Sequence, residues 1–456
     1  MSDHPLADSV EDPNAPIIPH AEPAEGTATL ELAAEHESNP IKRFLKVLGP
    51  GLITGASDDD PSGIGTYSVA GASLGFSTLW IALWTLPLMI SVQYISAKIG
   101  LVTGRGLAGV LRRHYSRKLL YPVVFGLTIA NMINAGVDIG AIAAAINLIV
   151  PIPITVMIIP IALAILALQI WGSYRLIANV FKWLTLALLA YVGAALFAKP
   201  DWGEVLKNTF IPTLTFDKTF LATVVAILGT TISPYLFFWQ ASEEVEEEIS
   251  MGRRTLRQRK GATNNELKFM SWDVNVGMIA SNVVMYFIIL ATAATLFKAG
   301  KTNIQSATEA AEALRPIAGD MARFLLALGL AGAGILAVPI LTGSAAYAVS
   351  EAFGWKYGLD QKPSRAKQFY AVIAGSTLIG MLINFIGINP IQALFWTSVI
   401  NGFLAPPVLV ILMLISNNKK VMGQRVNNRW MNILGWTTTG IMFLAAVAFV
   451  LTSLQS

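Results

Sequence analysis

The sequence predicts an all-α integral membrane protein in which two of the helices are interrupted inside the bilayer. Of its 456 residues, 54% are hydrophobic and 13% are charged, whereas a typical soluble domain carries about 25% charged residues. Apolar stretches of about twenty residues, long enough to cross the hydrocarbon core, recur along the chain. Two of these stretches contain a proline among polar residues, Pro61 and Pro234.

The apolar stretches predict eleven membrane spans. Their expected ranges are 46–72, 76–100, 120–148, 153–170, 175–197, 218–242, 271–298, 321–352, 369–388, 391–415 and 431–453. The most basic loops follow spans two, six, eight and ten. By the positive-inside rule, we expect the N-terminus in the cytoplasm and the C-terminus outside. The expected location is the cell membrane, which in a bacterium is the inner membrane.

The remaining composition excludes several function classes. Residues 1–42 are polar, with no lysine or arginine before Lys42, so they lack the features of a signal peptide and predict a disordered cytoplasmic tail. The chain has no cysteine and four histidines, none in a predicted span. These counts exclude disulfides, thiolate metal sites and an intramembrane histidine relay. We expect that the protein is not an enzyme and has neither a cofactor nor a nucleic-acid partner. We also expect it to be a monomer in the lipid bilayer.

Polar groups surround the proline in both interrupted spans. The first interruption reads GASDDDPSG over residues 55–63, and the second reads GTTISPY over residues 229–235. A helix tends to open at proline, and in a bilayer the opening persists only where it is buried in protein or lines a cavity.

The two interruptions occupy corresponding places in two halves of the chain. Their prolines lie 173 residues apart, which is close to the length of five spans. An offset of five spans inserts the second half upside down relative to the first. The pattern predicts a secondary transporter with inverted repeats at residues 43–200 (spans 1–5) and 201–416 (spans 6–10), followed by span 11 in residues 417–456.

The first interruption offers carboxylates as candidate cation ligands. Asp60 precedes Pro61 and is the favoured ligand, and Ser57 and Asp59 are further candidates. The alternative is that the acidic residues of the run 58–60 cap the half-helix that starts at Pro61.

The second interruption offers carbonyl and hydroxyl oxygens. Pro234 cannot donate a hydrogen bond, so we expect the Thr230 carbonyl to turn toward a cavity, with Ser233 beside it and Tyr235 as a further candidate. The alternative is back-bonding of hydroxyls to carbonyls in a kinked helix, which is the interpretation we favour for Thr231. All of these ligands are oxygens, which suit magnesium, calcium and manganese.

Several motifs resemble the Nramp divalent-metal transporters. They are the run from Gly49 to Gly63, the pair Leu79-Trp80 and the segment from Ala97 to Arg105. The resemblance extends over residues 45 to about 415 and implies the ten-span core of the LeuT-like fold, with helices 1 and 6 broken.

The resemblance also implies metal ligands, and this chain departs from several of them. Asp60 matches the Asp of the family's Asp-Pro-Gly-Asn motif, but Gly63 stands at the metal-binding Asn. Ser233 and Tyr235 stand at the Met and His of the Met-Pro-His motif. Ser398 stands where the family often has a metal-side Gln, with Asn401 one turn further on.

A further departure concerns the acidic pair that the family uses as a proton route in the third span. Asp138 fills one position, and Ala135 occupies the other. These departures resemble the Nramp-related magnesium transporters, a divergent branch, and imply transport without proton coupling.

The departures also change which metal ions the site is expected to favour. Loss of Met removes the soft ligand that favours transition metals. We expect Gly63 to leave volume for a magnesium ion that keeps several waters. The prediction is a carrier of hydrated Mg²⁺, with Mn²⁺ as a second substrate, that works by alternating access. A potential of 100 mV supplies about 4.6 kcal/mol to a divalent cation. The alternatives are a proton-coupled Mn²⁺/Fe²⁺ transporter of the ordinary Nramp type and an organic-substrate symporter of the same fold.

Overall fold

The computed structural model describes residues 49–172, 186–304, 306–315, 319–359 and 361–455. These residues form helices and no strands, which confirms the predicted all-α class. The tail at residues 1–42 lies outside the described residues, so its predicted disorder stays a prediction.

The helices of the first half are α3 (Pro50–Asp58), α4 (Pro61–Leu74), α5 (Leu79–Thr103), α6 (Leu107–His114), α7 (Arg117–Asn147), α8 (Ile154–Trp171) and α10 (Ala190–Phe197). Those of the second half are α11 (Trp202–Phe210), α12 (Lys218–Thr231), α13 (Pro234–Ser250), α14 (Leu256–Arg259), α15 (Asn264–Thr292), α16 (Ala307–Ala311), α18 (Ala322–Phe353), α19 (Lys367–Met381) and α20 (Pro390–Ser416). The chain ends with α21 (Lys419–Met422) and α22 (Arg429–Gln455).

Both predicted helix breaks are present. Asp59 and Asp60 separate α3 from α4, and Ile232 and Ser233 separate α12 from α13. In each case the second half-helix begins at the proline, Pro61 or Pro234. Proline suits the first helical position because its missing N–H would be unpaired there in any case.

The described residues contain nine helical stretches that are long and apolar enough to cross a membrane. One of them, Pro61–Thr103, joins α4 to α5 through the short 3₁₀ turn Gly75–Thr78, and thus combines parts of predicted spans one and two. The predicted span 175–197 lies partly outside the described residues, and α10 is its described end. The total of eleven spans therefore stays a prediction.

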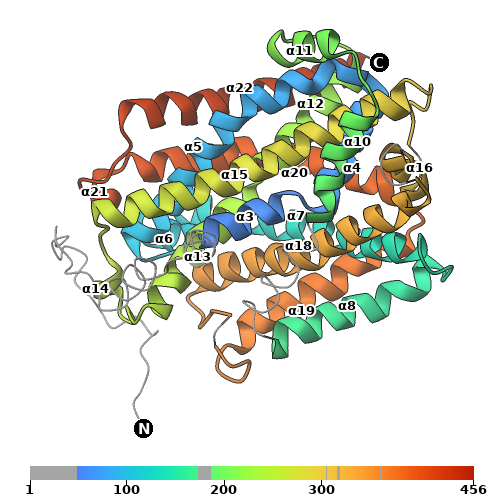
Figure 1. Cartoon of the computed structure of the whole chain (residues 1–456). Helices are drawn as coiled ribbons and strands as arrows, with labels where there is room; N and C mark the ends of the chain where they lie inside the picture. The colour runs from blue at the N-terminus through green and yellow to red at the C-terminus, as the bar shows by residue number, and fades with distance from the viewer. Residues whose placement is uncertain (1–48, 173–185, 305, 316–318, 360, 456) are drawn as a thin grey trace, which may run out of the picture.

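Helices at equivalent positions of the two predicted repeats pack together. The long helices α7 and α18, at spans three and eight, lie against each other, and α8 packs on α19, at spans four and nine (Figure 1). The half-helix α3 packs on α15, while α13 packs on α5. Helix α22 lies outside the repeats, against α5, α12 and α20. The division into two repeats stays a prediction.

Glycines let several of these helices approach with backbone in contact. A Cβ atom added to Gly55 of α3 would lie 2.3 Å from the Gly277 carbonyl oxygen of α15, and one added to Gly136 of α7 would lie 2.0 Å from that of Gly380 in α19. Small residues at membrane helix interfaces allow this close approach.

A side chain from α15 holds the start of α3. The Asp273 carboxylate accepts hydrogen bonds from the backbone N–H groups of Gly49 (3.0 Å), Gly51 (2.5 Å) and Leu52 (3.2 Å). The first N–H groups of a helix have no partner within the helix, so Asp273 supplies the acceptor that α3 lacks.

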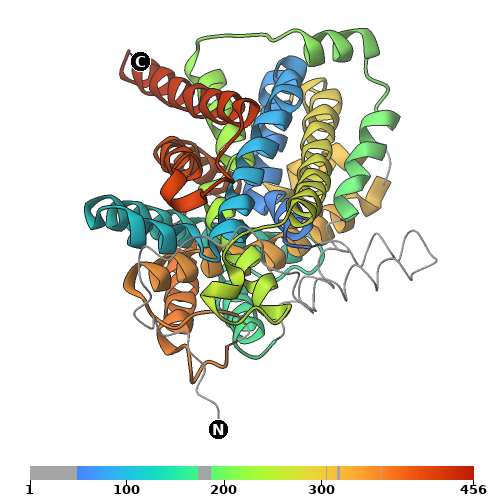
Figure 2. The ribbon, with the colours of Figure 1, turned by 90° about the vertical axis from the view of Figure 1, so that its left-hand side faces the viewer.

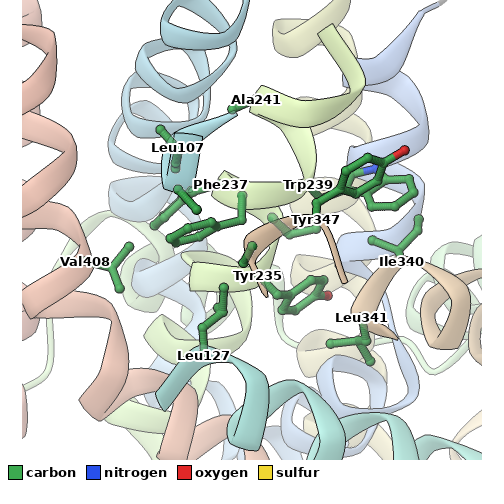
Figure 3. Packing of buried hydrophobic residues seen from close by; sticks show 14 of the residues in the cluster. Leu107, Leu127, Tyr235, Phe237, Trp239, Ala241, Ile340, Leu341, Tyr347 and Val408 are labelled. Carbon is green, nitrogen blue, oxygen red and sulfur yellow. The ribbon is translucent and has the colours of Figure 1, made fainter. Parts of the chain in front are cut away.

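Aromatic side chains of α13, the helix that follows the second break, form much of the packed core there. Phe237 and Trp239 are no more than 1% exposed, and Trp239 meets Tyr347 of α18 edge-on with ring centroids 6.0 Å apart (Figure 3). Gly343 of α18 makes room for the Trp239 ring, because a Cβ there would lie 2.7 Å from Trp239 Cζ3.

The basic loops gather at one end of the helix bundle. Figure 2 looks along the helices from this end, where the short helices α6, α14 and α21 lie. The Gly261 N–H bonds to the Val102 carbonyl at 2.9 Å, and Arg425 Nη1 bonds to Asn264 Oδ1 at 2.6 Å. The loops after spans two, six and ten thus meet, as the positive-inside rule requires of loops on one side of a membrane.

Candidate functional site

The two helix breaks lie side by side in the interior. Helix α4 packs on α12 and α13 packs on α3, and the Tyr235 hydroxyl lies 3.2 Å from both the Ser57 carbonyl oxygen and Asp60 Oδ2. Ser57, Asp60, Ser233 and Tyr235 are each no more than 1% exposed. The structure therefore brings candidates from both breaks into one site that is closed to solvent.

The Asp60 carboxylate has partners on three helices. Its Oδ1 accepts the Gly63 N–H of α4 at 2.6 Å, so Asp60 caps this half-helix, as the alternative interpretation proposed. Its Oδ2 faces Tyr235 of α13 and Nδ2 of Asn134 in α7, the latter at 3.3 Å. The capping role uses one carboxylate oxygen and leaves the other facing the second break.

Asp58 and Asp59 face a different helix from Asp60. Ser281 of α15 lies 2.5 Å from Asp58 Oδ2 and 3.2 Å from Asp59 Oδ1. Neither residue caps α4, a role that Asp60 fills. The candidate Asp59 thus lies toward α15 and not toward Tyr235.

At the second break, the Thr230 carbonyl is not in the environment that the sequence predicted. Ser233 Oγ lies 2.7 Å from the carbonyl oxygens of both Gly229 and Thr230 and donates to them. The Thr230 carbonyl therefore has a donor, contrary to the prediction that it is left open to a cavity, and Ser233 follows the back-bonding alternative. Thr231 also back-bonds, to the Ile227 carbonyl at 2.8 Å, as predicted.

The space beside Gly63 is already filled. A Cβ atom there would lie 3.1 Å from Thr230 Oγ1, 3.2 Å from the Asp58 carbonyl oxygen and 3.3 Å from Tyr67 Cε2. The expectation that Gly63 leaves volume for a hydrated ion is therefore wrong for this closed arrangement. The small residue instead lets α12 and its Thr230 hydroxyl approach the first break.

The candidates on α20 meet α4 further along the half-helix. Thr66 Oγ1 donates to Ser398 Oγ at 2.9 Å, and a Cβ atom on Gly229 of α12 would lie 2.1 Å from the Ser398 carbonyl oxygen. Asn401 lies one turn beyond Ser398 and is 3% exposed. Ser398 thus lies where α4, α12 and α20 meet.

The sequence-based prediction missed two residues beside Asp60, Ser62 and Asn134. Ser62 Oγ lies 2.6 Å from Asn134 Oδ1, 3.1 Å from Asp138 Oδ1 and 3.1 Å from Thr397 Oγ1. Asn134 and Asp138 lie four residues apart in α7, and this helical spacing in the sequence was a signal for Asn134. Ser62 and Asn134 link Asp60 to Asp138.

No group of three or more His, Cys, Asp or Glu side chains suited to hold a metal occurs in the part of the chain that the structure describes. The side chains of other helices that contact Asp60, those of Tyr235 and Asn134, are both neutral. Hard cations that keep part of their water shell tolerate this arrangement.

Comparison with known families decides the assignment of the chain. The profile of the Nramp family, described as Natural resistance-associated macrophage protein-like, matches residues 51–452. The chain belongs to the Nramp family. The match begins in α3 and ends in α22, so it includes both breaks and every candidate site residue of this Nramp protein.

One relative of this Nramp protein is the Divalent metal cation transporter MntH of Klebsiella pneumoniae (strain 342). The two are 27% identical over 421 residues, which cover 90% of this chain and 95% of the relative. MntH of Caldanaerobacter subterraneus subsp. tengcongensis is 26% identical over 415 residues, which cover 89% of this chain and 94% of the relative.

Solved structures show the same fold at low sequence identity. The Eremococcus coleocola manganese transporter in complex with an aromatic bis-isothiourea substituted compound superposes with a TM-score of 0.70 at 20% identity, covering 90% of this chain and 87% of that one. The likeness supports the LeuT-like arrangement expected from the two broken helices.

Proposed function

We propose that this Nramp protein is a secondary transporter of a hydrated divalent cation, Mg²⁺ first and Mn²⁺ second, that works by alternating access without proton coupling. The observation that carries the proposal is the Asp60 carboxylate, buried between the two breaks with one oxygen facing Tyr235 of the other break. The names of the relatives support a divalent metal as substrate, since they are divalent metal cation transporters and not enzymes.

The proposed ligands are oxygens from the two breaks and from α20. Asp60 supplies the negative charge, with Thr230, Ser398 and Asn401 as neutral oxygen ligands. Ser57 and Tyr235 are further candidates. The Tyr235 hydroxyl can turn its proton to the Ser57 carbonyl and present a lone pair to a cation beside Asp60.

Two of the candidate residues take indirect roles in this proposal. Gly63 donates its N–H to Asp60 and so orients the carboxylate. Ser233 donates to two carbonyls of α12 and so stabilises the second break. The remaining candidate, Asp59, faces α15 and would contribute charge without touching the cation.

The absence of soft ligands supports the preference for hard cations. Ser233 and Tyr235 stand where the resemblance expects Met and His, and neither offers sulfur or imidazole. Oxygen ligands suit Mg²⁺ and Mn²⁺, whereas thiolate, thioether and imidazole groups favour the later transition metals.

One observation favours the second candidate, a proton-coupled Mn²⁺/Fe²⁺ transporter. Ser62 and Asn134 form a hydrogen-bonded link from Asp60 to Asp138, so the remaining acid of the third span lies close to the site. The two proposals differ in one measurable quantity, the movement of protons with the metal.

The long apolar helices and the basic loops at one end of the bundle support a membrane location and an orientation for the protein. We propose that the protein acts as a monomer in the lipid bilayer of the cell membrane, the inner membrane of a bacterium, with its N-terminus in the cytoplasm and its C-terminus outside. The gathering of the basic loops at one end supports this orientation.

Binding calorimetry on the purified protein tests the site. We expect Mg²⁺ binding that is weakened at least tenfold in Asp60→Ala and unchanged in Glu204→Gln, an exposed acid on α11. Cd²⁺ binding tighter than Mg²⁺ binding would overturn the hard-site proposal.

Transport assays test the coupling. Proteoliposomes with an inside-negative potential should take up Mg²⁺ with no change in internal pH. Acidification of the lumen that accompanies metal uptake would instead establish the proton-coupled alternative.

A further inference from the structure

A cleft of about 300 Å³ opens between α5 and α15 on the outside of the bundle. It is lined by Tyr94 of α5 and by Leu267, Lys268, Ser271, Trp272 and Asn275 of α15. Trp272 is 64% exposed. The cleft is separate from the two breaks, whose residues are buried.

The cleft lies at the depth of a lipid headgroup. Helix α15 begins at Asn264, at the end of the bundle where the basic loops gather. At a rise of 1.5 Å per residue, Lys268 lies about 6 Å and Asn275 about 16 Å from the helix start. A tryptophan at this depth is typical of the membrane interface.

The charge around the cleft is positive. Lys268 lines it. Lys98 is buried behind this lining, with Nζ 5.9 Å from the centroid of the Tyr94 ring and bonded to Asn427 Oδ1 at 2.6 Å. Arg425 is bonded to Asn264, one turn before Lys268.

The nearby acids are turned elsewhere. Asp273 caps α3 on the other side of α15, and Glu266 pairs with Arg253. The cleft therefore combines the positive charge of Lys268 with the exposed aromatic side chain of Trp272.

We propose that this cleft binds an anionic phospholipid of the leaflet on the side of the basic loops. Lys268 contacts the phosphate, and Ser271, whose Oγ accepts a hydrogen bond from Asn275 Nδ2 at 3.4 Å, donates its own proton to a headgroup or glycerol oxygen. Trp272 lies along the first part of an acyl chain. A lipid fits better than a free phosphate because the apolar Trp272 ring beside Lys268 is 64% exposed, and an acyl chain can cover this ring whereas a free phosphate cannot.

Thermal unfolding of the purified full-length protein in detergent tests the lipid site. Added phosphatidylglycerol should raise the Tm in a saturable way, whereas phosphatidylcholine and inorganic phosphate should not. Lys268→Ala and Trp272→Ala should each raise the half-saturating phosphatidylglycerol concentration at least fivefold. The control Lys301→Ala removes an exposed lysine outside the cleft and should titrate like the wild type.

Other outcomes would overturn the proposal. Equal stabilisation by phosphatidylcholine would remove the role of charge, and equal stabilisation by inorganic phosphate would remove the role of the acyl chain. Titration of Lys268→Ala and Trp272→Ala like the wild type would place the lipid elsewhere. Because both residues are exposed, their substitution should leave the fold intact, which the Tm without lipid checks.

Discussion

Tyr235 joins the two helix breaks to each other through its hydroxyl group, which lies 3.2 Å from Asp60 Oδ2. The same hydroxyl lies 3.2 Å from the Ser57 carbonyl oxygen. It has a single proton and can donate to only one of these acceptors at a time. The choice between them gives the site two hydrogen-bonding states without movement of the backbone.

Removal of this hydroxyl should weaken cation binding. We expect Tyr235→Phe to lower the Mg²⁺ affinity about tenfold, because the cation loses the hydroxyl lone pair of Tyr235, a contact comparable to a hydrogen bond to a charged group, about 1.5 kcal/mol. Calorimetry measures the change. Tyr286→Phe is the matched control, since its hydroxyl bonds to Thr209 and not to either break. An unchanged affinity in Tyr235→Phe would mean that Tyr235 only packs.

Restoration of the asparagine that the family resemblance expects at Gly63 should destabilise the protein. The Cβ atom alone comes within 3.1–3.3 Å of Thr230, Asp58 and Tyr67, and overpacking of a closed core costs about 1–3 kcal/mol. We expect a lower Tm for Gly63→Asn and a smaller decrease for Gly63→Ala. If Gly63→Asn melts at the wild-type temperature, the closed packing at the break is not the stable state in solution.

An added methyl group should also destabilise the contact between α3 and α15. A Cβ atom on Gly277 would lie 2.2 Å from the Gly51 carbonyl oxygen, so we expect Gly277→Ala to lower stability by about 1–3 kcal/mol and to slow metal uptake. Gly375→Ala in α19 is the control, because no atom lies within 4 Å of its Cβ position. Thermal unfolding measures the stability, and metal-uptake assays measure the transport rate, of both Gly277→Ala and Gly375→Ala.

A buried ion pair at the basic end provides a test outside the spans. Arg253 is 3% exposed and bonds to Glu248 at 2.9 Å and also to Glu266. Although burial lowers the pKa of Arg253, the carboxylates of Glu266 and Glu248 raise it above its usual value. The arginine therefore stays charged at neutral pH.

Loss of this arginine should leave a buried glutamate without its partner. We expect Arg253→Met to cost about 3–5 kcal/mol, measured as a decrease in Tm. The exposed neighbour Arg254 provides the control Arg254→Met, which should change the Tm little. Equal effects of the two substitutions would argue against a stabilising role for the pair.

The sequence predicted the architecture better than the details of the site. Pro61 and Pro234 stand among polar residues and located both breaks, whereas Pro87, Pro122 and Pro339 in apolar stretches lie inside continuous helices. The orientation of Asp59 toward α15 and the hydrogen bond from Ser233 to the Thr230 carbonyl depend on how neighbouring helices pack, which one span cannot specify. The role of Ser62 depends on α7 and α20 in the same way.

The acceptor at the start of α3 belongs to another helix, Asp273 of α15, and this gives the half-helix an all-or-none attachment. If α3 moves away from α15, the N–H groups of Gly49, Gly51 and Leu52 lose their acceptor in the same step. The hold on the start of α3 therefore depends on one side chain of α15, and the loss of this single carboxylate would leave all three N–H groups without their acceptor together.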